Sequence, residues 1–219
     1  SEQKTFGEIK KESRGLRELP CEEKAGLIFV ILTPGEHMEL NDFMAGMLED
    51  LEKANFKDWA YLGKREIEGA NWKIAFDGYL EGYHFSQLHP ETIHPRTISN
   101  LTHYEAFGPH MRIGFAQTEI KEKLESQPKE SWGKMENNGF DFVRILFPNV
   151  SIFLAPEITQ IAQLFPGETP DKNKTILNFY RKSPPKDDED KAGLEGMMDF
   201  LKMVVLEEDY MIGDLIQKG

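Results

Sequence analysis

The sequence predicts an α+β domain in which an antiparallel sheet of about seven to nine strands packs against a long C-terminal helix. Two observations carry this prediction. Short apolar segments with alternating patterns recur between residues 101 and 182, and turn residues separate them by connections too short for parallel crossovers. Residues 187–217 instead repeat apolar side chains at intervals of three, four and seven, which is typical of an amphipathic helix.

The N-terminal part is expected to begin with a linker, because residues 1–25 are charged and contain glycine and proline. Residues 26–32 form a continuous apolar run that predicts a buried strand. A helix is predicted from about residue 41 to residue 54, since apolar side chains recur on one face. The side chains of that face are Phe43, Met44, Met47, Leu48 and Leu51.

The central part alternates between predicted strands and irregular segments. Residues 56–70 favour one or two strands, and the amphipathic pattern that follows favours a helix near residues 71–83. A loop is expected at residues 91–100, and residues 101–118 again have a strand pattern. The charged residues 120–138 indicate a surface helix or a lid.

Four more strands and the last helix complete the prediction. The strands cover residues 142–147, 150–154, 159–165 and 174–182. The apolar stripe of the last helix consists of Leu194, Met198, Leu201, Val205, Ile212 and Ile216.

Composition excludes several classes of partner. The chain has 26 Lys and Arg against 38 Asp and Glu, a net charge of −12, which argues against nucleic acid and anionic membranes. No apolar run approaches the roughly 20 residues that a spanning helix needs, and no signal peptide opens the chain. A single cysteine excludes an internal disulfide and fits a reducing compartment. We therefore expect a cytoplasmic protein.

Residues 71–90 concentrate side chains that carry chemistry. Asp77 and Glu81 are four residues apart on one side of the predicted helix, and Glu81 stands three residues before His84. His84 and His89 would be splayed by roughly 140° on an unbroken helix. The glycine at position 82 and the proline after His89 offer breaks that could turn both rings inward.

This spacing is compatible with a metal site, although two ordinary histidines at a helix end would produce the same pattern. Two histidines and one carboxylate form the ligand set of mononuclear non-haem Fe(II) enzymes that activate dioxygen. Asp77 and Glu81 are placed to accept a hydrogen bond from a ligand imidazole. Asp209 falls on the apolar stripe of the last helix, so it must either pair with a cation or bind a metal. Glu208 beside it is the alternative ligand.

Several short motifs occur together in one known family. They are Asn71-Trp72-Lys73, Glu81-x-Tyr83-His84, His89-Pro90, Leu146-Phe147-Pro148-Asn149, and Glu208-Asp209 followed by Gln217. In combination they resemble the catalytic domain of the large (alpha) subunit of Rieske-type aromatic ring-hydroxylating oxygenases. Residues 15–23 and 26–30 resemble the segment that joins that domain to a preceding cluster domain.

The resemblance implies a helix-grip fold of the Bet v 1-like or START-like kind, in which a curved antiparallel sheet wraps around a long C-terminal helix. It selects His84, His89 and Asp209 as the ligands of Fe(II). Asp77 and Glu81 would support the ligands, and Glu81 matches the position through which the family passes electrons from the cluster of a neighbouring subunit.

The expected activity is the activation of dioxygen at Fe(II) and the hydroxylation of an apolar, aromatic substrate. The electrons would come from a Rieske [2Fe–2S] cluster, which needs two cysteines and two histidines and cannot form on a chain with one cysteine. Either a preceding cluster domain is absent from this chain, or the natural protein has none and obtains electrons elsewhere. The linker-like residues 1–25 favour the first alternative, with residues 26–219 as the iron domain. A reductase or ferredoxin, and a homotrimer or alpha-beta hetero-oligomer, are the implied partners.

A cavity between the sheet and the helices would hold the substrate. Its expected walls are apolar and consist of Phe76, Phe85, Leu88, Phe147, Phe153 and Leu164. Two alternatives stay open. The chain could be a non-catalytic helix-grip module that encloses a hydrophobic ligand without metal, or an inactive alpha-like subunit that keeps the fold and assembles with a partner.

Overall fold

The computed structural model describes residue 5 and residues 14–134 and 139–219. Most of the predicted linker, and residues 135–138 of the predicted surface segment, lie outside the described residues. The chain forms two compact units, residues 1–57 and residues 58–219, and each is described by itself. None of the helices in the described part is both long enough and apolar enough to cross a membrane.

The first unit contains a two-stranded antiparallel sheet of β1 (Cys21–Lys24) and β2 (Leu27–Val30). The chain reverses at Gly26, which has a φ of +77° and where a Cβ would lie 2.1 Å from the backbone nitrogen of Lys57. Only glycine fits such a position. β1 lies within the predicted linker.

The predicted strand at residues 26–32 is present, but it is not buried. Ile28 and Leu32 are 70% and 82% exposed. A strand directs alternate side chains to opposite faces, and a two-stranded ribbon has too little sheet to cover both. The prediction that this strand is buried, which was based on its continuous apolar run, is therefore wrong.

The predicted helix at residues 41–54 is two helices, α1 (Leu40–Met44) and α2 (Met47–Ala54). The interruption falls at Ala45, whose φ of +46° is incompatible with a right-handed helix. Met44, Met47 and Leu51 are fully buried as the apolar stripe predicts, whereas Phe43 is 44% exposed.

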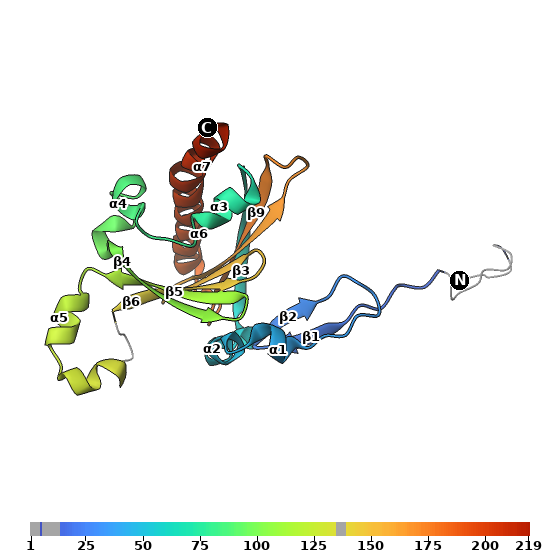
Figure 1. Ribbon diagram of the computed structural model, residues 1–219, viewed down its shortest axis with the longest axis horizontal. Helices are drawn as coiled ribbons and strands as arrows, with labels where there is room; N and C mark the ends of the chain where they lie inside the picture. Colours follow the sequence, from blue (N-terminus) through green and yellow to red (C-terminus); the bar gives the residue numbers. More distant parts are fainter. Residues whose placement is uncertain (1–4, 6–13, 135–138) are drawn as a thin grey trace. The chain divides into compact units, whose positions relative to one another are not determined.

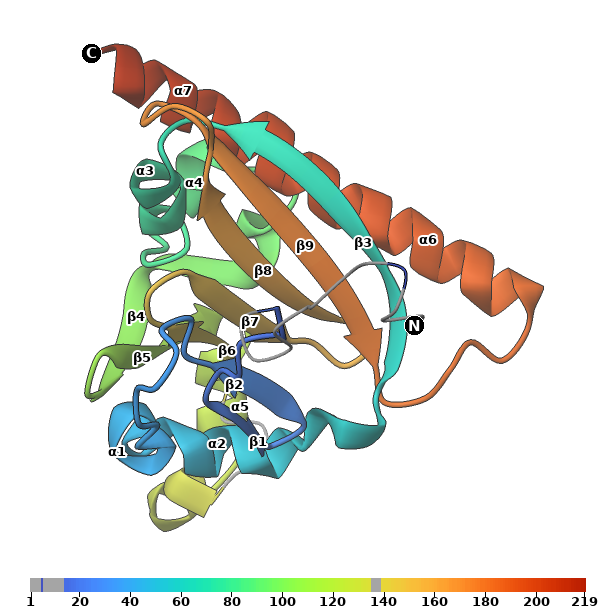
Figure 2. The same ribbon diagram turned by 90° about the vertical axis from the view of Figure 1, so that its right-hand side faces the viewer.

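The second unit is built on a seven-stranded antiparallel sheet (Figures 1 and 2). Its strands are β3 (Ala60–Gly69), β4 (Thr97–Phe107), β5 (His110–Gln117), β6 (Phe140–Leu146), β7 (Val150–Leu154), β8 (Thr159–Pro166) and β9 (Asn173–Arg181). The spatial order is β3-β9-β8-β7-β6-β5-β4, with every neighbouring pair antiparallel. The predicted pattern at residues 101–118 is a hairpin of two strands, and β4 begins within the predicted loop.

Short helices fill the connections. They are η3 (Phe56–Asp58), α3 (Trp72–Asp77), α4 (Phe85–Leu88), η4 (His94–Arg96), α5 (Ile120–Glu125) and η5 (Lys129–Lys134). The predicted surface helix at residues 120–138 thus appears, in its described part, as two short segments.

The C-terminal helix runs through α6 (Asp188–Met203), η6 (Val204–Tyr210) and α7 (Met211–Lys218). Asp187 caps its start by accepting a hydrogen bond from the backbone nitrogen of Asp190 at 2.8 Å, and the acidic first turn suits the helix dipole. The middle segment η6 is a π-helix, a rare geometry that is frequent at functional sites.

The long helix lies along the sheet and contacts β3, as Figure 2 shows. The core between helix and sheet combines side chains from both, including Ile67, Ile113, Leu164, Leu177, Phe179, Met198, Val205 and Tyr210. The predicted α+β architecture, with a curved antiparallel sheet and a long C-terminal helix, is confirmed.

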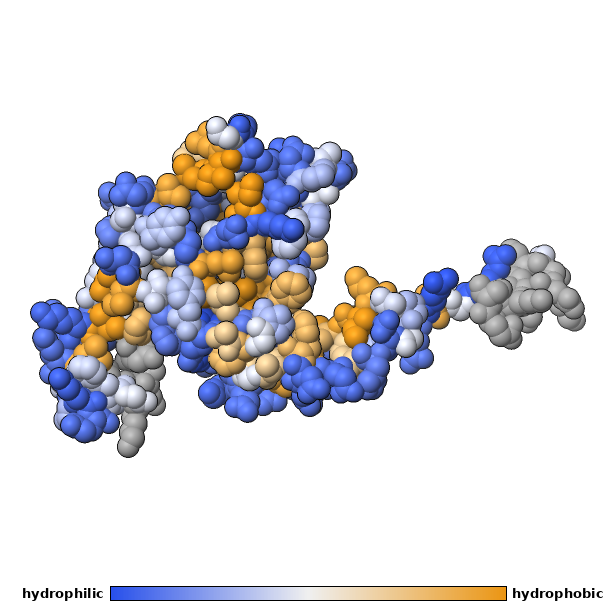
Figure 3. Space-filling model, viewed as in Figure 1, coloured by the Kyte–Doolittle hydropathy of each residue, from blue (hydrophilic) through white to orange (hydrophobic). Residues whose placement is uncertain are grey.

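The apolar stripe of the last helix is buried for most of its length but not at its end. Leu194 and Met198 are 5% and 1% exposed, whereas Ile216 is 64% exposed. Figure 3 shows hydrophobic surface over α7. A repeat of three and four residues identifies one face of a helix, but it does not show where the covering sheet stops.

Candidate metal centre

The segment predicted as one amphipathic helix contains two short helices, α3 and α4, joined by an irregular turn. Gly82 lies in this turn, where a Cβ would be 2.9 Å from the ring of Phe115 on β5. The absence of a side chain at Gly82 therefore lets the turn approach the sheet.

His84 and His89 flank the four residues of α4, one at each end. The helix stops at His89, whose carbonyl oxygen accepts hydrogen bonds from the backbone nitrogens of residues 92, 93 and 94 at 3.3, 3.3 and 3.0 Å. This break brings the two imidazoles to a centroid distance of 5.1 Å, instead of splaying them across an unbroken helix.

Asp209 of η6 completes the cluster. Its Oδ1 atom lies 2.9 Å from His89 Nε2 and 3.4 Å from His84 Nε2. One ligand atom from each of the three residues lies within 4.8 Å of the other two. The structure therefore brings together three residues that are up to 125 positions apart in the chain (209 minus 84).

Each imidazole is held from behind by a second carboxylate. His84 Nδ1 contacts Glu81 Oε1, and His89 Nδ1 contacts Glu208 Oε2. Thr92 supports the second pair by donating a hydrogen bond from Oγ1 to Glu208 Oε2 at 2.7 Å. A proton held on each Nδ1 leaves the Nε2 lone pairs directed toward Asp209, which is how metal-ligating histidines are commonly fixed.

The same contacts change the acid–base properties of the cluster. Burial lowers the pKa values of His84 and His89, but the hydrogen bonds and charges of Asp209 and their Glu partners outweigh burial and raise both above 6.5. Burial raises the pKa of Asp209, but the two imidazoles outweigh it and lower that pKa below 3.8. Without a metal, the cluster is therefore stabilised as carboxylates around protonated imidazoles.

The residues present fit a divalent metal ion. The ligand set contains two neutral-capable imidazoles and one carboxylate, the composition of facial-triad iron sites. His84 Nε2 is buried and has no hydrogen-bond partner among the described residues, since its 3.4 Å approach to Asp209 lacks hydrogen-bond geometry. A buried polar atom without a partner is unfavourable in a protein interior, so a metal would satisfy it.

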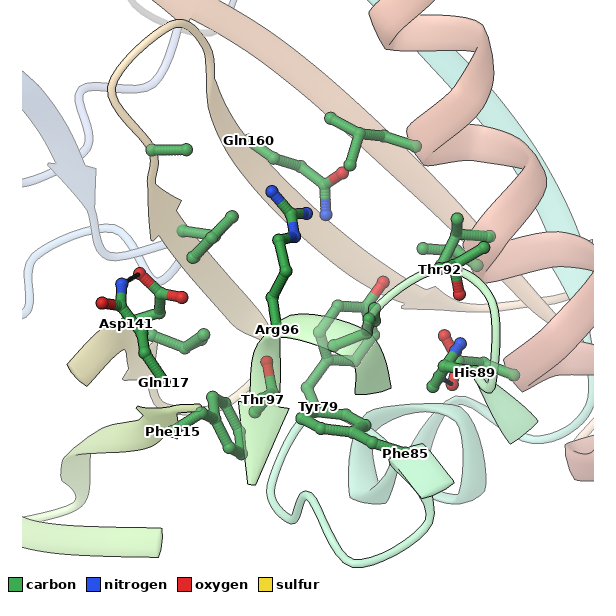
Figure 4. Close-up of a pocket in the computed structure, with 18 of the residues that line it drawn as sticks. Tyr79, Phe85, His89, Thr92, Arg96, Thr97, Phe115, Gln117, Asp141 and Gln160 are labelled. Atoms are coloured by element: carbon green, nitrogen blue, oxygen red, sulfur yellow. Dashed lines mark hydrogen bonds and ion pairs between the residues drawn. The ribbon is translucent and has the colours of Figure 1, made fainter. Parts of the chain in front are cut away.

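A cavity of about 540 Å³ opens beside the cluster (Figure 4). Its walls near the cluster are largely apolar and include Phe85, Phe115, Val143, Phe153 and Val205. The cavity reaches from the cluster to a polar end formed by Gln117, Asp141 and Lys123. Its volume is sufficient for a small organic molecule.

Comparison with known families identifies the fold. Residues 56–219 match the family described as ring hydroxylating alpha subunit (catalytic domain). The chain belongs to this family. No curated protein matches the chain in sequence.

Solved structures of Rieske oxygenases share the architecture of this alpha-subunit catalytic domain. The quaternary ammonium Rieske monooxygenase CntA in complex with gamma-butyrobetaine aligns with a TM-score of 0.71 at 17% identity, covering 100% of this chain and 55% of that chain. A mutant naphthalene 1,2-dioxygenase bound to phenanthrene aligns with a TM-score of 0.67 at 13% identity, covering 100% and 58%. The chain thus spans about half the length of these proteins, and the predicted helix-grip fold is confirmed.

The three acidic residues predicted beside the proposed ligands have different positions. Glu81 contacts His84, whereas Asp77 is exposed and forms no hydrogen bond or ion pair with either histidine in the described structure. Glu208, expected only as an alternative to Asp209, holds His89 instead. Sequence reasoning missed this role, since Glu208 and His89 are 119 positions apart and no local pattern links them.

Only two of the six predicted pocket residues line the cavity. Phe85 and Phe153 line the cavity. Among the described residues, the other four lie outside its lining. Phe76 and Leu164 are buried in the core, Phe147 is 56% exposed, and Leu88 is half-buried at the end of α4. Apolar character predicts burial, but it does not separate a cavity wall from packed core.

Polar residues of the cavity were not predicted from the sequence. Gln117 Nε2 donates a hydrogen bond to Asp141 Oδ1 at 2.8 Å, and Lys123 Nζ donates one to Gln117 Oε1 at 2.5 Å. Gln160 is only 9% exposed, and its Oε1 atom has no hydrogen-bond partner in the described part of the chain. Burying such a group costs about 1–3 kcal/mol. Alternating strand positions could have suggested these residues only if the sheet's concave face had been known.

Proposed function

We propose that this catalytic domain is the oxygenase component of a Rieske-type enzyme, with a mononuclear Fe(II) held by His84, His89 and Asp209. The observation that carries the proposal is the convergence of both Nε2 atoms on one carboxylate while a Glu holds each Nδ1. Membership of the ring hydroxylating alpha subunit family supports oxygenase chemistry. Ferrous iron, when bound, would supply the activation of dioxygen.

The chain's residues would prepare the site in three ways. Glu81 and Glu208 keep the Nδ1 protons in place, so that both histidines present a lone pair to the metal. Asp209 would neutralise one of the two positive charges of the ion, leaving a net charge near +1. Phe85, Phe115 and Phe153 line the adjacent cavity and would exclude water around an apolar, aromatic substrate.

Electrons would reach the site from a Rieske [2Fe–2S] cluster outside this chain, whose single cysteine cannot complete one. Glu81 is the candidate for the receiving side. It contacts His84 on one side, and its side chain keeps 28% exposure on the other. A reductase or ferredoxin, and a trimeric or alpha-beta assembly that brings a cluster close to Glu81, complete this proposal.

Anaerobic Fe(II) titration followed by desalting and metal analysis tests the proposal. We expect one iron per chain, and its loss in His84→Ala, His89→Ala and Asp209→Ala. His103→Ala is the matched control, because His103 is half-exposed on β4 and lies outside the cluster. Full iron in Asp209→Ala, or none in the unaltered protein, would refute the ligand assignment. Circular dichroism of each variant separates metal loss from unfolding.

The cavity also favours a second candidate, a module that binds a hydrophobic ligand without metal. The same titration separates the two, because a metal-free module would retain no iron. Its hydrophobic ligand would also bind equally well when His84 and Asp209 are replaced. An inactive alpha-like subunit would instead bind iron but give no product when combined with a cluster domain, a reductase and aromatic substrates.

A further inference from the structure

Gln160 interrupts an apolar row that crosses the sheet. The strand register pairs Ile113 with Val143, Val143 with Phe153, Phe153 with Gln160, and Gln160 with Phe179. Residues paired in this way direct their side chains to the same face of the sheet. Gln160 is the polar member of this row, and its buried amide oxygen is unpaired within the described structure. The amide lines the cavity, so a donor on a bound molecule would satisfy Oε1, and an acceptor could bind Nε2, which also has no hydrogen-bond partner in the described structure.

Arg96 presents a second unpaired group to the same cavity. It ends η4 immediately before β4, and Figure 4 shows its guanidinium directed toward Gln160. No hydrogen bond or ion pair joins that guanidinium to any described residue. Arg96 is an exposed residue, so water solvates its guanidinium and a bound anion could take the place of that water.

The carboxylates that line the polar end of the cavity are already engaged. Asp141 accepts the hydrogen bond of Gln117 at 2.8 Å, and Glu119 lies 3.6 Å from Lys123 Nζ. Neither forms an ion pair with Arg96. Arg96 is therefore a cation of this wall that no described carboxylate neutralises, in a chain with a net charge of −12.

We infer that the cavity takes an organic acid, whose carboxylate binds Arg96 and Gln160 while its apolar body lies along Phe85, Phe115 and Phe153. Guanidinium groups bind carboxylates through two parallel hydrogen bonds, and Nε2 of Gln160 supplies a further donor. Oε1 of Gln160 is an acceptor, so a carboxylate does not satisfy it. The inference rests on the proposed function in one respect, namely that the bound molecule is the substrate. It narrows that substrate from any apolar compound to an apolar acid whose charged group lies away from the metal ligands.

Binding of acids and of their neutral amides tests the inference. The probes are 2-naphthoate, phenylacetate and octanoate, each compared with its carboxamide by titration calorimetry at fixed ionic strength. We expect at least one acid to bind about tenfold more tightly than its amide, as a charge-assisted hydrogen bond predicts. If no acid of the three binds more tightly than its amide, the inference is overturned.

Two variants then locate the contact. Arg96→Gln should weaken acid binding about tenfold and leave amide binding within about twofold. Gln160→Leu should weaken acid binding about threefold or more without lowering the melting temperature, since it removes an unpaired buried amide. Lys121→Gln, which removes one positive charge from the exposed face of α5, is the control for net charge. Retention of the acid preference in Arg96→Gln would refute the assignment.

These measurements remain informative if the proposed iron site fails. The acid-to-amide ratio is measured on metal-free protein, whereas metal loading is measured without any acid present. If the protein binds no iron but still binds acids more tightly than their amides, only the oxygenase proposal is overturned. If the protein binds iron but does not prefer acids to amides, only the acid site is overturned.

Discussion

Glu208 and Asp209 are consecutive residues that contact opposite nitrogens of the same imidazole. Glu208 Oε2 contacts His89 Nδ1, and Asp209 Oδ1 lies 2.9 Å from His89 Nε2. Consecutive side chains diverge by about 100° on a regular helix. Both lie in the π-helical segment η6, and His89 is placed so that its ring spans the two carboxylates. One carboxylate can thus bind a metal while the other holds the ligand in position.

This arrangement predicts that Glu208→Gln weakens metal binding without removing a ligand. Loss of the carboxylate behind an imidazole typically lowers metal affinity about 10- to 100-fold. Competition with a chelator of known affinity measures the change. Glu207→Gln is the matched control, because Glu207 is the exposed neighbour in the same segment. Equal affinities in the two variants would contradict a supporting role for Glu208.

Glu81→Gln should slow turnover when a Rieske cluster domain and reductase are supplied, even with enough iron to fill a site that loses the same kind of support as in Glu208→Gln. The amide can still contact His84 Nδ1, whereas it cannot carry the negative charge proposed to assist electron arrival. Asp77→Asn provides the comparison, since Asp77 is an exposed carboxylate that touches neither histidine. Unchanged product formation with full iron in Glu81→Gln would remove this residue from the electron path.

Metal binding should weaken as the solution becomes more acidic. Burial lowers the pKa values of His84 and His89, but Asp209 and the two Glu carboxylates outweigh burial and raise both pKa values above 6.5. Protons therefore begin to compete with the metal for the imidazoles at a pH above 6.5, and they compete more strongly as the pH falls. The folding stability of the metal-free protein depends on pH in the opposite direction. The stabilisation that comes from the raised histidine pKa values is fully present below pH 6.5 and is lost as the pH rises through those pKa values.

Melting curves of metal-free and metal-loaded protein between pH 6 and pH 9 measure both effects. We expect the stabilisation conferred by metal to increase with pH across this window, because the protonated imidazoles compete less. A stabilisation that does not change with pH would mean that the two imidazoles are not the metal ligands.

Gly82→Ala should destabilise the fold and disturb the cluster together. The new Cβ would lie 2.9 Å from the ring of Phe115, and such overpacking typically costs about 1–3 kcal/mol. Gly78→Ala is the control in the same turn, since a Cβ there meets only the carbonyl oxygen of Ala75 at an ordinary 3.5 Å. Denaturant unfolding measures the free energy of unfolding of both. Equal stability would show that the approach of the turn to β5 is not tight.

Local patterns predicted most of the secondary structure. Alternation identified β7 at residues 150–154 without error, and periodicity identified the extent of the C-terminal helix to within one residue at each end. Patterns were least accurate where geometry depends on one residue. Ala45 divides the predicted helix at residues 41–54, and the turn through Gly82 divides the helix predicted near residues 71–83.

The sequence by itself determined most of the elements and their order along the chain, and its resemblance to a known family selected the three residues proposed to bind metal. The motifs around His84, His89 and Asp209 are contiguous stretches that can be read without coordinates. Only the tertiary structure decided that Glu208, rather than Asp77, holds an imidazole, and that Gln160 and Arg96 face a cavity. These relationships depend on segments far apart in the chain meeting in space, and side-chain periodicity describes only how each segment presents its own faces.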